Sequence, residues 1–479
     1  MIEPHPPIAG LPIPADNASG TQVHADLVVI GFGKGGKTLA AALGRQGWRV
    51  VMIEQSAEMY GGTCINIGCV PTKSLVYQSE HLTKDEVGPD SYRDAVSIEL
   101  ALTSKLRAEN LAMLDGIETV TVITGRARFL DPHTLHVTIP DGGGTVTVMA
   151  EHVVVSTGAK PIIPDIPGLR DSAVLATSTE LLTSMELPPR LVVLGGGYVG
   201  LEFAAMYAAY GSEVTILEHR PQILGQEDDD VAACARDILR HNGVTVITGA
   251  EVRRVEDTSG PAATVFYEHD GCTESVGADV ILAALGRRPV TADLDLDRAG
   301  VRLTSDGAVV VDEHLRSSQP HIFAIGDVNG GPQFTYISLD DYRIVIDQLI
   351  GGGIRSTAQR VAVPYTLFMT PPLARVGLTE RDARAAGCRV KVAALPVAKM
   401  ATVPRAGIVA ETRGMMKVVV NADNDEILGA ALLSYDSHEV INTVALAMRH
   451  GITAAQLRDE IYTHPSMTEA FNQLLAALT

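Results

Sequence analysis

Two cysteines, Cys64 and Cys69, stand five residues apart in the segment GGTCINIGCVPTK (residues 61–73) of a 479-residue chain that has only five cysteines. In a regular helix this separation places the Cα atoms roughly 8–9 Å apart. A disulfide needs about 4.4–6.8 Å, so a bridge requires a distorted turn, which Asn66 and Gly68 can supply. Such a bridge should be reducible, and its small loop gives little structural stabilisation. The pair therefore indicates redox chemistry at sulfur.

Zinc is the main alternative for paired thiols. Zinc pairs usually have about two to four residues between the cysteines, and the metal needs further ligands from elsewhere in the chain. The spacing here falls in that range, but the sequence has no second cysteine pair. Two unrelated buried thiols are the other alternative. A redox dithiol beside a cofactor is the preferred interpretation, and we predict no metal site.

A glycine-rich turn precedes the cysteines. An apolar run over residues 27–30 is followed by Gly31, Gly33 and Gly36, by a helical pattern and by a second apolar run that ends at Glu54. Glycines at this spacing let backbone N–H groups approach a pyrophosphate at the helix N-terminus. Glu54 comes 23 residues after the first glycine, where a carboxylate can accept from a ribose hydroxyl. The sequence therefore predicts a dinucleotide site.

The same pattern recurs later in the chain. Gly195, Gly197 and Gly200 are followed by Glu218, again 23 residues after the first glycine. An accidental glycine-rich turn is the alternative, and two matches with equal spacing argue against it. Two such units imply two dinucleotides bound by two domains.

The order along the chain assigns the nucleotides. Cys64 follows Glu54 by ten residues, so the dithiol belongs with the first nucleotide fold. A dithiol needs a two-electron donor beside it, and a flavin can act as one; the first site should therefore hold FAD and the second a nicotinamide. We expect NADH, because Glu218 would repel a 2′-phosphate. NADPH is the alternative, because Arg220 can accommodate that phosphate.

Other segments fit around the two nucleotide folds. A strand pattern ends in a glycine turn at Gly158, and a strand over residues 322–325 delivers Asp327 at its carboxyl end, where ligands collect in such sheets. After about residue 360 the glycine motifs stop and an α+β pattern begins. We predict an α/β protein with two Rossmann-like dinucleotide-binding domains, for FAD and then NAD(P)H, and a C-terminal α+β domain.

The expected segments follow in chain order. They are a disordered N-terminal lead, the first part of the FAD-binding domain, the NAD(P)H-binding domain, a central part of the FAD-binding domain and the C-terminal domain: residues 1–22, 23–165, 166–289, 290–360 and 361–479.

Composition limits the classes of partner. The formal net charge is −19, so we expect neither nucleic acid nor an anionic membrane surface as a partner. No apolar run approaches the roughly 20 residues of a membrane span, and the N-terminus lacks the features of a secretory signal. The other cysteines are scattered at Cys234, Cys272 and Cys388, which argues against a disulfide framework and favours a cytoplasmic location.

From about residue 26 to its end, the chain resembles the pyridine nucleotide-disulfide oxidoreductases. The motifs that carry the resemblance are GGTCINIGCVPTK, STGAKPIIP, GGGYVGLEFA, ALGRRP, IFAIGDV and YTHPSMTE. The resemblance implies that Cys64 is the outer interchange thiol and that Cys69 is the inner thiol in charge-transfer contact with the flavin. It also implies that Lys73 lies beside flavin N5 with Glu202 as its ion-pair partner.

The resemblance extends to further site residues. Asp327 is implied to contact the ribityl chain of the flavin, Gly158 to line the FAD site and Gly286 to line the NAD(P)H site. His464 and Glu469 match an acid–base pair in which the carboxylate orients the imidazole. In this family that pair reaches the active site of the partner subunit, so a homodimer formed through a C-terminal dimerisation domain is implied.

One branch of the family fits more closely than the others. The segments VIGFGKGGKTLAAAL, QFTYISLDDYRIV and YDSHEVIN resemble bacterial flavoproteins of reactive-chlorine resistance, which implies reduction of hypothiocyanous acid, or of copper(II), in oxidative-stress defence. The alternatives are a dihydrolipoamide dehydrogenase, a mercuric-reductase-like enzyme and a non-catalytic redox-sensing flavoprotein. The C-terminal FNQLLAALT has no thiol pair, which argues against a mercuric reductase.

Val290 and the YTHPSM form of the histidine motif depart from the wider family. His438 and Glu439 are candidates for binding copper. The preferred interpretation is that they have a structural role at the start of a helix.

Overall fold

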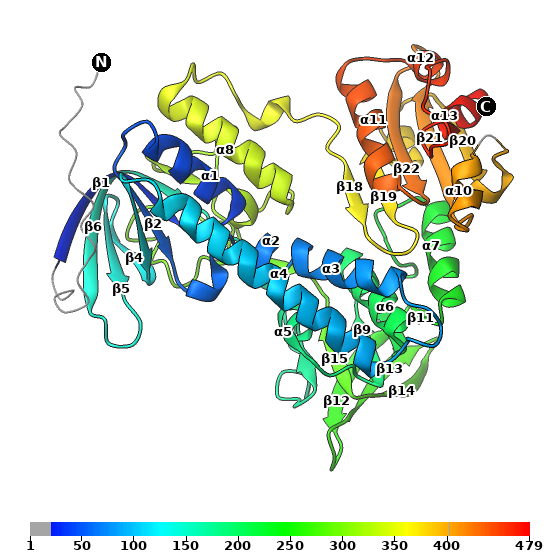
Figure 1. The fold of residues 1–479 in the computed structure, drawn as a ribbon, viewed down its shortest axis with the longest axis horizontal. Helices are drawn as coiled ribbons and strands as arrows, with labels where there is room; N and C mark the ends of the chain where they lie inside the picture. Colours follow the sequence, from blue (N-terminus) through cyan, green and yellow to red (C-terminus); the bar gives the residue numbers. More distant parts are fainter. Residues whose placement is uncertain (1–20, 402) are drawn as a thin grey trace. The chain divides into compact units, whose positions relative to one another are not determined.

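The computed structural model describes residues 21–401 and 403–479, and Figure 1 traces their helices and strands. They form two compact units, each assembled from three stretches of chain: residues 21–72, Ile98–Ile162 and Gly286–Gln359 in the first, and Lys73–Ser97, Ile163–Leu285 and Arg360–Thr479 in the second. Residues 1–20 of the predicted N-terminal lead lie outside the described residues, and residues 21 and 22 begin the first strand. The five-segment division by function stays a prediction.

Within the described residues, the first unit is built on a seven-stranded sheet with the order β3-β2-β1-β6-β5-β4, in which β17 also pairs with β6. The strands are β1 (Thr21–Ile30), β2 (Val50–Glu54), β3 (Val120–Thr124), β4 (Arg126–Asp131), β5 (Thr134–Thr138), β6 (Thr145–Val155) and β17 (Ile322–Ala324). The parallel core strands are apolar runs because both of their faces are covered: all four residues of the predicted run 27–30 are buried. A separate pair joins β7 (Ala159–Pro161) to β16 (Arg287–Pro289).

Helices cover the first sheet. Helices α1 (Lys34–Gly44) and α8 (Thr335–Ile350) lie side by side, blue and yellow in Figure 1, and their apolar residues share one core with the sheet. The other helical elements that lie wholly or partly in this unit are η1 (Ala57–Met59), α2 (Thr63–Asn66), α3 (Cys69–Glu80), α4 (Pro89–Asp115), η2 (Gly326–Asn329) and η3 (Thr357–Gln359). Helices α3 and α4 each continue from one unit into the other.

The second unit contains a parallel sheet with the order β11-β10-β9-β15-β8 and a small antiparallel sheet, β12-β13-β14. The strands are β8 (Leu175–Ala176), β9 (Arg190–Leu194), β10 (Glu213–Glu218), β11 (Thr245–Thr248), β12 (Glu251–Asp257), β13 (Ala263–His269), β14 (Cys272–Ala278) and β15 (Val280–Ala283). The helices are α5 (Ser178–Thr183), α6 (Tyr198–Tyr210) and α7 (Asp229–His241). The succession β9, α6, β10 repeats the succession β1, α1, β2 of the first unit, as the repeated glycine pattern predicted.

The same unit also contains the C-terminal α+β part. Its antiparallel sheet has the order β18-β19-β22-β21-β20. The elements are β18 (Tyr365–Leu367), β19 (Leu373–Gly377), α9 (Glu380–Ala385), β20 (Val390–Pro396), η4 (Val397–Lys399), α10 (Pro404–Ile408), β21 (Met415–Asn421), β22 (Ile427–Leu433), α11 (Ser437–Arg449), α12 (Ala454–Arg458) and α13 (Ala470–Ala476). The predicted fold class is therefore confirmed. In the described part of the chain, no helix has both the length and the apolar character that crossing a bilayer requires.

Gly168 lies at a close approach between two backbone segments of the second unit. Its φ is +79°, and an added Cβ would lie 2.0 Å from the carbonyl oxygen of Val255 on β12. The approach is close because Val255 N donates to Pro167 O at 2.9 Å. We expect Gly168→Ala to lower the free energy of unfolding by about 3 kcal/mol, from backbone strain and steric overlap together.

Gly243→Ala is the matched control for this prediction. Gly243 also has a positive φ, +86°, but no atom lies within 4 Å of an added Cβ. Strain alone should cost about 1 kcal/mol there. Thermal unfolding of the two variants measures the difference, and equal losses would show that the contact with Val255 does not constrain the fold.

Candidate active site

The two cysteines lie on either side of a break between α2 and α3. Cys64 is the second residue of α2, and Cys69 is the first residue of α3. The backbone leaves the helical conformation at Ile67, with φ −143° and ψ 23°, and the helix resumes after Gly68. The distorted turn that the spacing requires is thus present; Gly68 lies in it as predicted, and Ile67 takes the place predicted for Asn66, which is still helical.

Both sulfurs are free thiols, with Cys64 partly buried and Cys69 exposed. They hydrogen-bond to each other, and the Cys69 sulfur lies 3.6 Å from the Thr335 hydroxyl oxygen on α8. The hydrogen bond with Cys69, burial and the charge of Cys69 raise the pKa of Cys64. A hydrogen bond with Thr335 and the positive charge of Lys37 act in the opposite direction without reversing the shift. Attack by Cys64 on an oxidant therefore requires a group that takes its proton.

Lys73 and Glu202, which were expected to pair, form an ion pair in the second unit. Lys73 Nζ donates to Glu202 Oε2 at 2.7 Å, and the side chains are 31% and 12% exposed. The other carboxylate oxygen accepts from Phe368 N at 2.9 Å, and the ammonium lies 4.7 Å from the centroid of the Phe368 ring. Glu202 thus holds Lys73 in a defined position on α3, the helix that Cys69 begins. The role of Lys73 beside a flavin stays a prediction.

The first glycine motif forms a cradle that fits a pyrophosphate. Gly31 has φ +102°, and an added Cβ would lie 2.3 Å from Ser156 O. A Cβ at Gly36 would lie 2.9 Å from Gly31 O, so the turn and the helix meet without room for a side chain. Gly33 is the N-cap of α1, so the helix begins at this turn, as a pyrophosphate site requires, although the N–H of Gly35 already donates to Ser338 Oγ at 3.0 Å.

Glu54 lies at the end of β2, as predicted for a ribose ligand. Its two carboxylate oxygens accept from Phe32 N at 2.9 Å and from Ser56 N at 3.3 Å. Burial raises the pKa of Glu54, and the backbone hydrogen bonds offset only part of this rise. Each oxygen retains a lone pair for a hydroxyl donor. The carboxylate therefore fits a ribose and also fixes the glycine turn.

Asp327 and Gly158 lie at the carboxyl ends of neighbouring strands, β17 and β6, in the first unit. Burial raises the pKa of Asp327, and the nearby charge of Arg287 lowers it in part. Gly158 has φ +71°, and the nearest atom to an added Cβ, Thr63 Oγ1, lies 3.9 Å away, so the space beside it is open. A partly buried acceptor and an open glycine at this edge fit the FAD that the sequence predicts.

The second glycine motif repeats the cradle of the first. A Cβ at Gly195, where φ is +106°, would lie 2.7 Å from Ala284 O, and one at Gly200 would lie 2.2 Å from Gly195 O. Gly197 is the N-cap of α6, and no atom lies within 4 Å of its added Cβ. These features fit a second dinucleotide. Gly286 directly follows Ala284 and Leu285, both of which approach Gly195, and its carbonyl oxygen accepts from Ile162 N at 3.0 Å. Its place in the NAD(P)H site stays a prediction.

Glu218 closes the second cradle as Glu54 closes the first. It is 6% exposed and accepts from Gly196 N at 2.6 Å and from Arg220 N at 2.8 Å. Arg220 is exposed, and its backbone rather than its guanidinium contacts the carboxylate. The carboxylate therefore stays at the position where it would meet a ribose or repel a 2′-phosphate.

The loop after β10 contains a buried network that sequence reasoning missed. Glu227 is fully buried, forms an ion pair with Arg375 at 3.1 Å, and accepts hydrogen bonds from Tyr198 and Tyr365 at 3.3 and 3.2 Å. Burial raises the pKa of Glu227, whereas the charge of Arg375 lowers it. Tyr198 directly follows Gly197, so the network holds the start of α6. The acidic run QEDDD was the only sequence signal.

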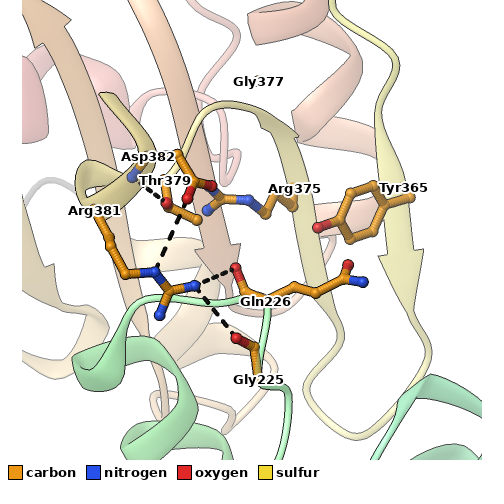
Figure 2. Close-up of a pocket in the computed structure, with 8 residues that line it drawn as sticks. All are labelled: Gly225, Gln226, Tyr365, Arg375, Gly377, Thr379, Arg381 and Asp382. Atoms are coloured by element: carbon orange, nitrogen blue, oxygen red, sulfur yellow. Dashed lines mark hydrogen bonds and ion pairs between the residues drawn. The ribbon is translucent and has the colours of Figure 1, made fainter. Parts of the chain in front are cut away.

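Figure 2 shows how the same loop is fixed to the C-terminal part of the second unit. Arg381 donates to the carbonyl oxygens of Gly225 and Gln226, both at 3.3 Å. The pocket between them has a volume of about 320 Å³ and polar walls made by Gly225, Gln226, Tyr365, Arg375, Gly377, Thr379, Arg381 and Asp382. Arg375 Nη1 is paired with Glu227 and Arg381 with backbone carbonyls, so these contacts have a structural role, whereas the buried Arg375 Nη2 has no hydrogen-bond partner among the described residues.

His464 and Glu469 pair as the sequence motif implied. His464 Nδ1 lies 2.9 Å from Glu469 Oε2, and the other carboxylate oxygen accepts from Ser466 N at 3.0 Å. Although burial alone would raise the pKa of Glu469, the hydrogen bonds from His464 and Ser466 lower it overall. The imidazole is 69% exposed. A carboxylate thus orients an exposed imidazole, which suits a proton carrier that completes a site on a second chain; that role stays a prediction.

His438 and Glu439 occupy the first turn of α11. The His438 ring lies 5.5 Å from the Phe368 ring, centroid to centroid. Among the described residues, no group of three or more His, Cys, Asp or Glu side chains is arranged to hold a metal ion. In the described part of this chain, His438 and Glu439 therefore have no third protein ligand with which to bind copper.

Comparison with known proteins adds to this geometry. The family described as "Pyridine nucleotide-disulphide oxidoreductase" matches residues 25–341, and its dimerisation domain matches residues 363–475. The "Probable pyridine nucleotide-disulfide oxidoreductase RclA" of Escherichia coli (strain K12) is 45% identical over 94% of this chain and 98% of its own length. A mercuric reductase of Staphylococcus aureus is 34% identical over 95% of this chain and 82% of its own. A dihydrolipoyl dehydrogenase of Geobacillus stearothermophilus is 32% identical over 93% and 94%.

Solved structures agree with these sequence matches. The Cu(II) complex of the HOCl-induced flavoprotein disulfide reductase RclA from Escherichia coli is similar with a TM-score of 0.89 and 45% identity, over 95% of this chain and 99% of that one. A second solved structure, of the HOCl-induced flavoprotein disulfide reductase RclA from Escherichia coli, is similar with a TM-score of 0.88 and 45% identity, over 94% of this chain and 99% of that one.

The Lys73–Glu202 pair yields a stability prediction. Glu202→Gln leaves a partly buried ammonium without its carboxylate while keeping an acceptor for Phe368 N. We expect the free energy of unfolding to fall by about 1–3 kcal/mol. The control, Glu109→Gln, breaks an exposed pair with Lys105 whose atoms are 3.9 Å apart, and should change stability by less than about 0.5 kcal/mol. Urea unfolding of both variants compares them; a Glu202 effect no larger than the control would contradict the prediction.

Proposed function

The chain belongs to the pyridine nucleotide-disulphide oxidoreductase family, and we propose that it uses Cys64 and Cys69 to reduce hypothiocyanous acid with electrons from NADH in oxidative-stress defence. Membership makes it an oxidoreductase that depends on FAD and NAD(P)H. The matched dimerisation domain makes it a homodimer. The family resemblance read from the sequence is thereby confirmed; the oxidant and the choice of NADH are our proposals.

The observation that carries the proposal is the hydrogen-bonded thiol pair at the helix break, in a chain that shares 45% identity with RclA. A solved structure of that relative is described as an HOCl-induced flavoprotein disulfide reductase, which supports an oxidant of the hypohalous-acid type, of which hypothiocyanous acid is the thiocyanate analogue. Hypothiocyanous acid is a small electrophile at sulfur, so it requires an accessible thiol and a proton carrier rather than a large specificity pocket.

The chemistry that bound FAD supplies is the transfer of two electrons from NAD(P)H to the Cys64–Cys69 disulfide. Cys64 then attacks the sulfur of hypothiocyanous acid, forms an S–S bond and expels the oxygen, which leaves as water. Cys69 attacks the Cys64 sulfur, displaces thiocyanate and closes the disulfide. Overall, two thiols and HOSCN give a disulfide, thiocyanate, water and one proton, so the cysteines lose two electrons and the oxidant gains them.

Side chains around the thiols must transfer the protons of this reaction. Because the hydrogen bond with Cys69 and burial raise the pKa of Cys64, its proton must be taken before it attacks. We assign this to His464 of the partner subunit, whose imidazole Glu469 orients in each chain. Lys73, held by Glu202, is assigned to the FAD site, together with Glu54, Asp327 and the first glycine cradle.

Copper(II) is the second candidate oxidant, because the solved Escherichia coli relative is a Cu(II) complex. Dihydrolipoamide dehydrogenase activity remains the enzyme alternative, since such a relative matches at 32% identity. A panel of hypothiocyanous acid, Cu(II), oxidised lipoamide, glutathione disulfide and Hg(II) separates these, and the absence of turnover with all five would favour a redox sensor.

Loss of the outer thiol tests the proposed oxidant and mechanism together. Purified protein, NADH and hypothiocyanous acid should consume NADH rapidly. We expect Cys64→Ser to lower the rate by about a thousandfold or more, because a nucleophile is removed. Rapid turnover that survives Cys64→Ser would mean that the oxidant does not react at this thiol. Negligible turnover beside fast reduction of lipoamide would support the dehydrogenase alternative.

The second glycine cradle predicts the nicotinamide. We expect a higher kcat/KM for NADH than for NADPH, because the Glu218 carboxylate repels a 2′-phosphate. Glu218→Gln keeps an acceptor for Gly196 N and removes the charge, so the ratio should shift toward NADPH by about tenfold. Glu213→Gln, at the exposed end of the same strand, is the control and should leave the ratio unchanged. A wild-type preference for NADPH would refute the assignment.

A further inference from the structure

Lys37 is a buried lysine that the proposed function does not use. It lies on α1 and is 5% exposed. Its Nζ donates to the carbonyl oxygen of Gly61 at 3.3 Å and to Oδ1 of Asn110 on α4. Among the described residues it makes no ion pair, so both of its acceptors are neutral. A buried ammonium held only by neutral groups costs free energy, and it keeps its positive charge available to its surroundings.

Gly61 connects this ammonium to the dithiol. Gly61 and Gly62 have φ of +97° and +78°, and a Cβ on Gly62 would lie 2.7 Å from Gly33 Cα. The turn that they make therefore has no room for a side chain at Gly62. It leads directly into α2, where Cys64 is the second residue. Lys37 thus binds the carbonyl of the turn that sets the position of Cys64.

The charged and titratable groups that face the two side chains can be named. For Lys37, burial and the charge of Lys34 lower the pKa to about 8, and the charge of Cys64 raises it. For Cys64, the facing groups are Cys69, which raises the pKa, and Thr335 and Lys37, which lower it. At neutral pH Lys37 is charged, because its pKa is still above neutrality. It is the one cation among these groups that favours the Cys64 thiolate.

We propose that Lys37 is a positioning residue of the dithiol site: its ammonium holds the Gly61 turn and supplies, from within the same chain, the fixed positive charge that stabilises the thiolate of Cys64. The inference rests on the proposed function only in taking Cys64 as the attacking thiol. Lys37 carries no proton to or from the substrate. It complements His464 of the partner subunit, which is assigned to moving the proton.

The test measures the reactivity of Cys64 against pH in the holoenzyme. A Cys69→Ser background leaves Cys64 as the only thiol of the pair, and mass spectrometry of its peptide follows alkylation by iodoacetamide, which reacts with thiolate. Lys37→Gln keeps a donor for Gly61 O and removes the charge. We expect its alkylation profile to shift to higher pH by about one unit, equivalent to about tenfold slower reaction at neutral pH. Lys37→Arg should restore most of the rate.

A second variant leaves Lys37 and α1 intact and so covers the case in which Lys37→Gln does not fold. Asn110→Asp places a carboxylate against the ammonium and neutralises it, so its profile should shift in the same direction as that of Lys37→Gln. Asn110→Ala removes the hydrogen bond without adding charge and should stay close to the parent profile. Unchanged profiles in Lys37→Gln and Asn110→Asp, or equal shifts in Asn110→Ala and Asn110→Asp, would overturn the proposal. The assay contains neither NADH nor hypothiocyanous acid, so failure of the proposed oxidant leaves its result interpretable.

Discussion

The hydrogen bond between Cys64 and Cys69 requires a helix that stops and restarts between them, and the surrounding structure holds that interrupted helix in place. Two short helices joined at Ile67 have little stability of their own, because so few residues form so few backbone hydrogen bonds. One side chain of α2 itself and one of α4 fix the turn. Asn66 donates to the carbonyl oxygens of Tyr60 and Gly62, both at 3.0 Å, and accepts from Arg107 on α4 at 2.9 Å. The position of the thiols therefore depends both on Asn66 within α2 and on Arg107 outside their own helices.

Two carboxylates show how one side chain serves both the fold and the ligand. Glu54 and Glu218 each accept from the backbone N–H of the residue that follows the first glycine of their motif, Phe32 in one case and Gly196 in the other. The equal spacing in the sequence thus has a structural cause, because the acid must reach back across the sheet to the turn. A ribose would use the acceptor capacity that remains. The backbone hydrogen bonds therefore hold each carboxylate in the position from which it would meet a ribose.

The sequence predicted the parts of the site that local pattern determines. Glycines at a fixed spacing, an acid at the end of the next strand and paired cysteines all report backbone geometry within one short segment, so they could be read directly. The partners of Lys37 and Glu227 could not be predicted from the sequence in this way. Asn110 is 73 residues from Lys37, and Arg375 is 148 residues from Glu227. Such contacts depend on how distant elements pack, and a single polar residue in a helix or loop has no periodicity that reveals its partner.

The buried charges divide into two groups by how they are compensated. In the second unit, Glu227 is paired with Arg375, and the buried Lys417 with three carboxylates, those of Asp228, Asp230 and Glu380. In the first unit, the buried Lys37 forms no ion pair among the described residues. Compensated charges specify how segments meet, since removing one partner strands the other. An uncompensated buried charge has a free-energy cost that packing does not offset, and it acts on whatever lies beside it. The first unit, which contains the thiols and the predicted FAD cradle, thus also contains, in Lys37, a buried charge that no ion pair compensates.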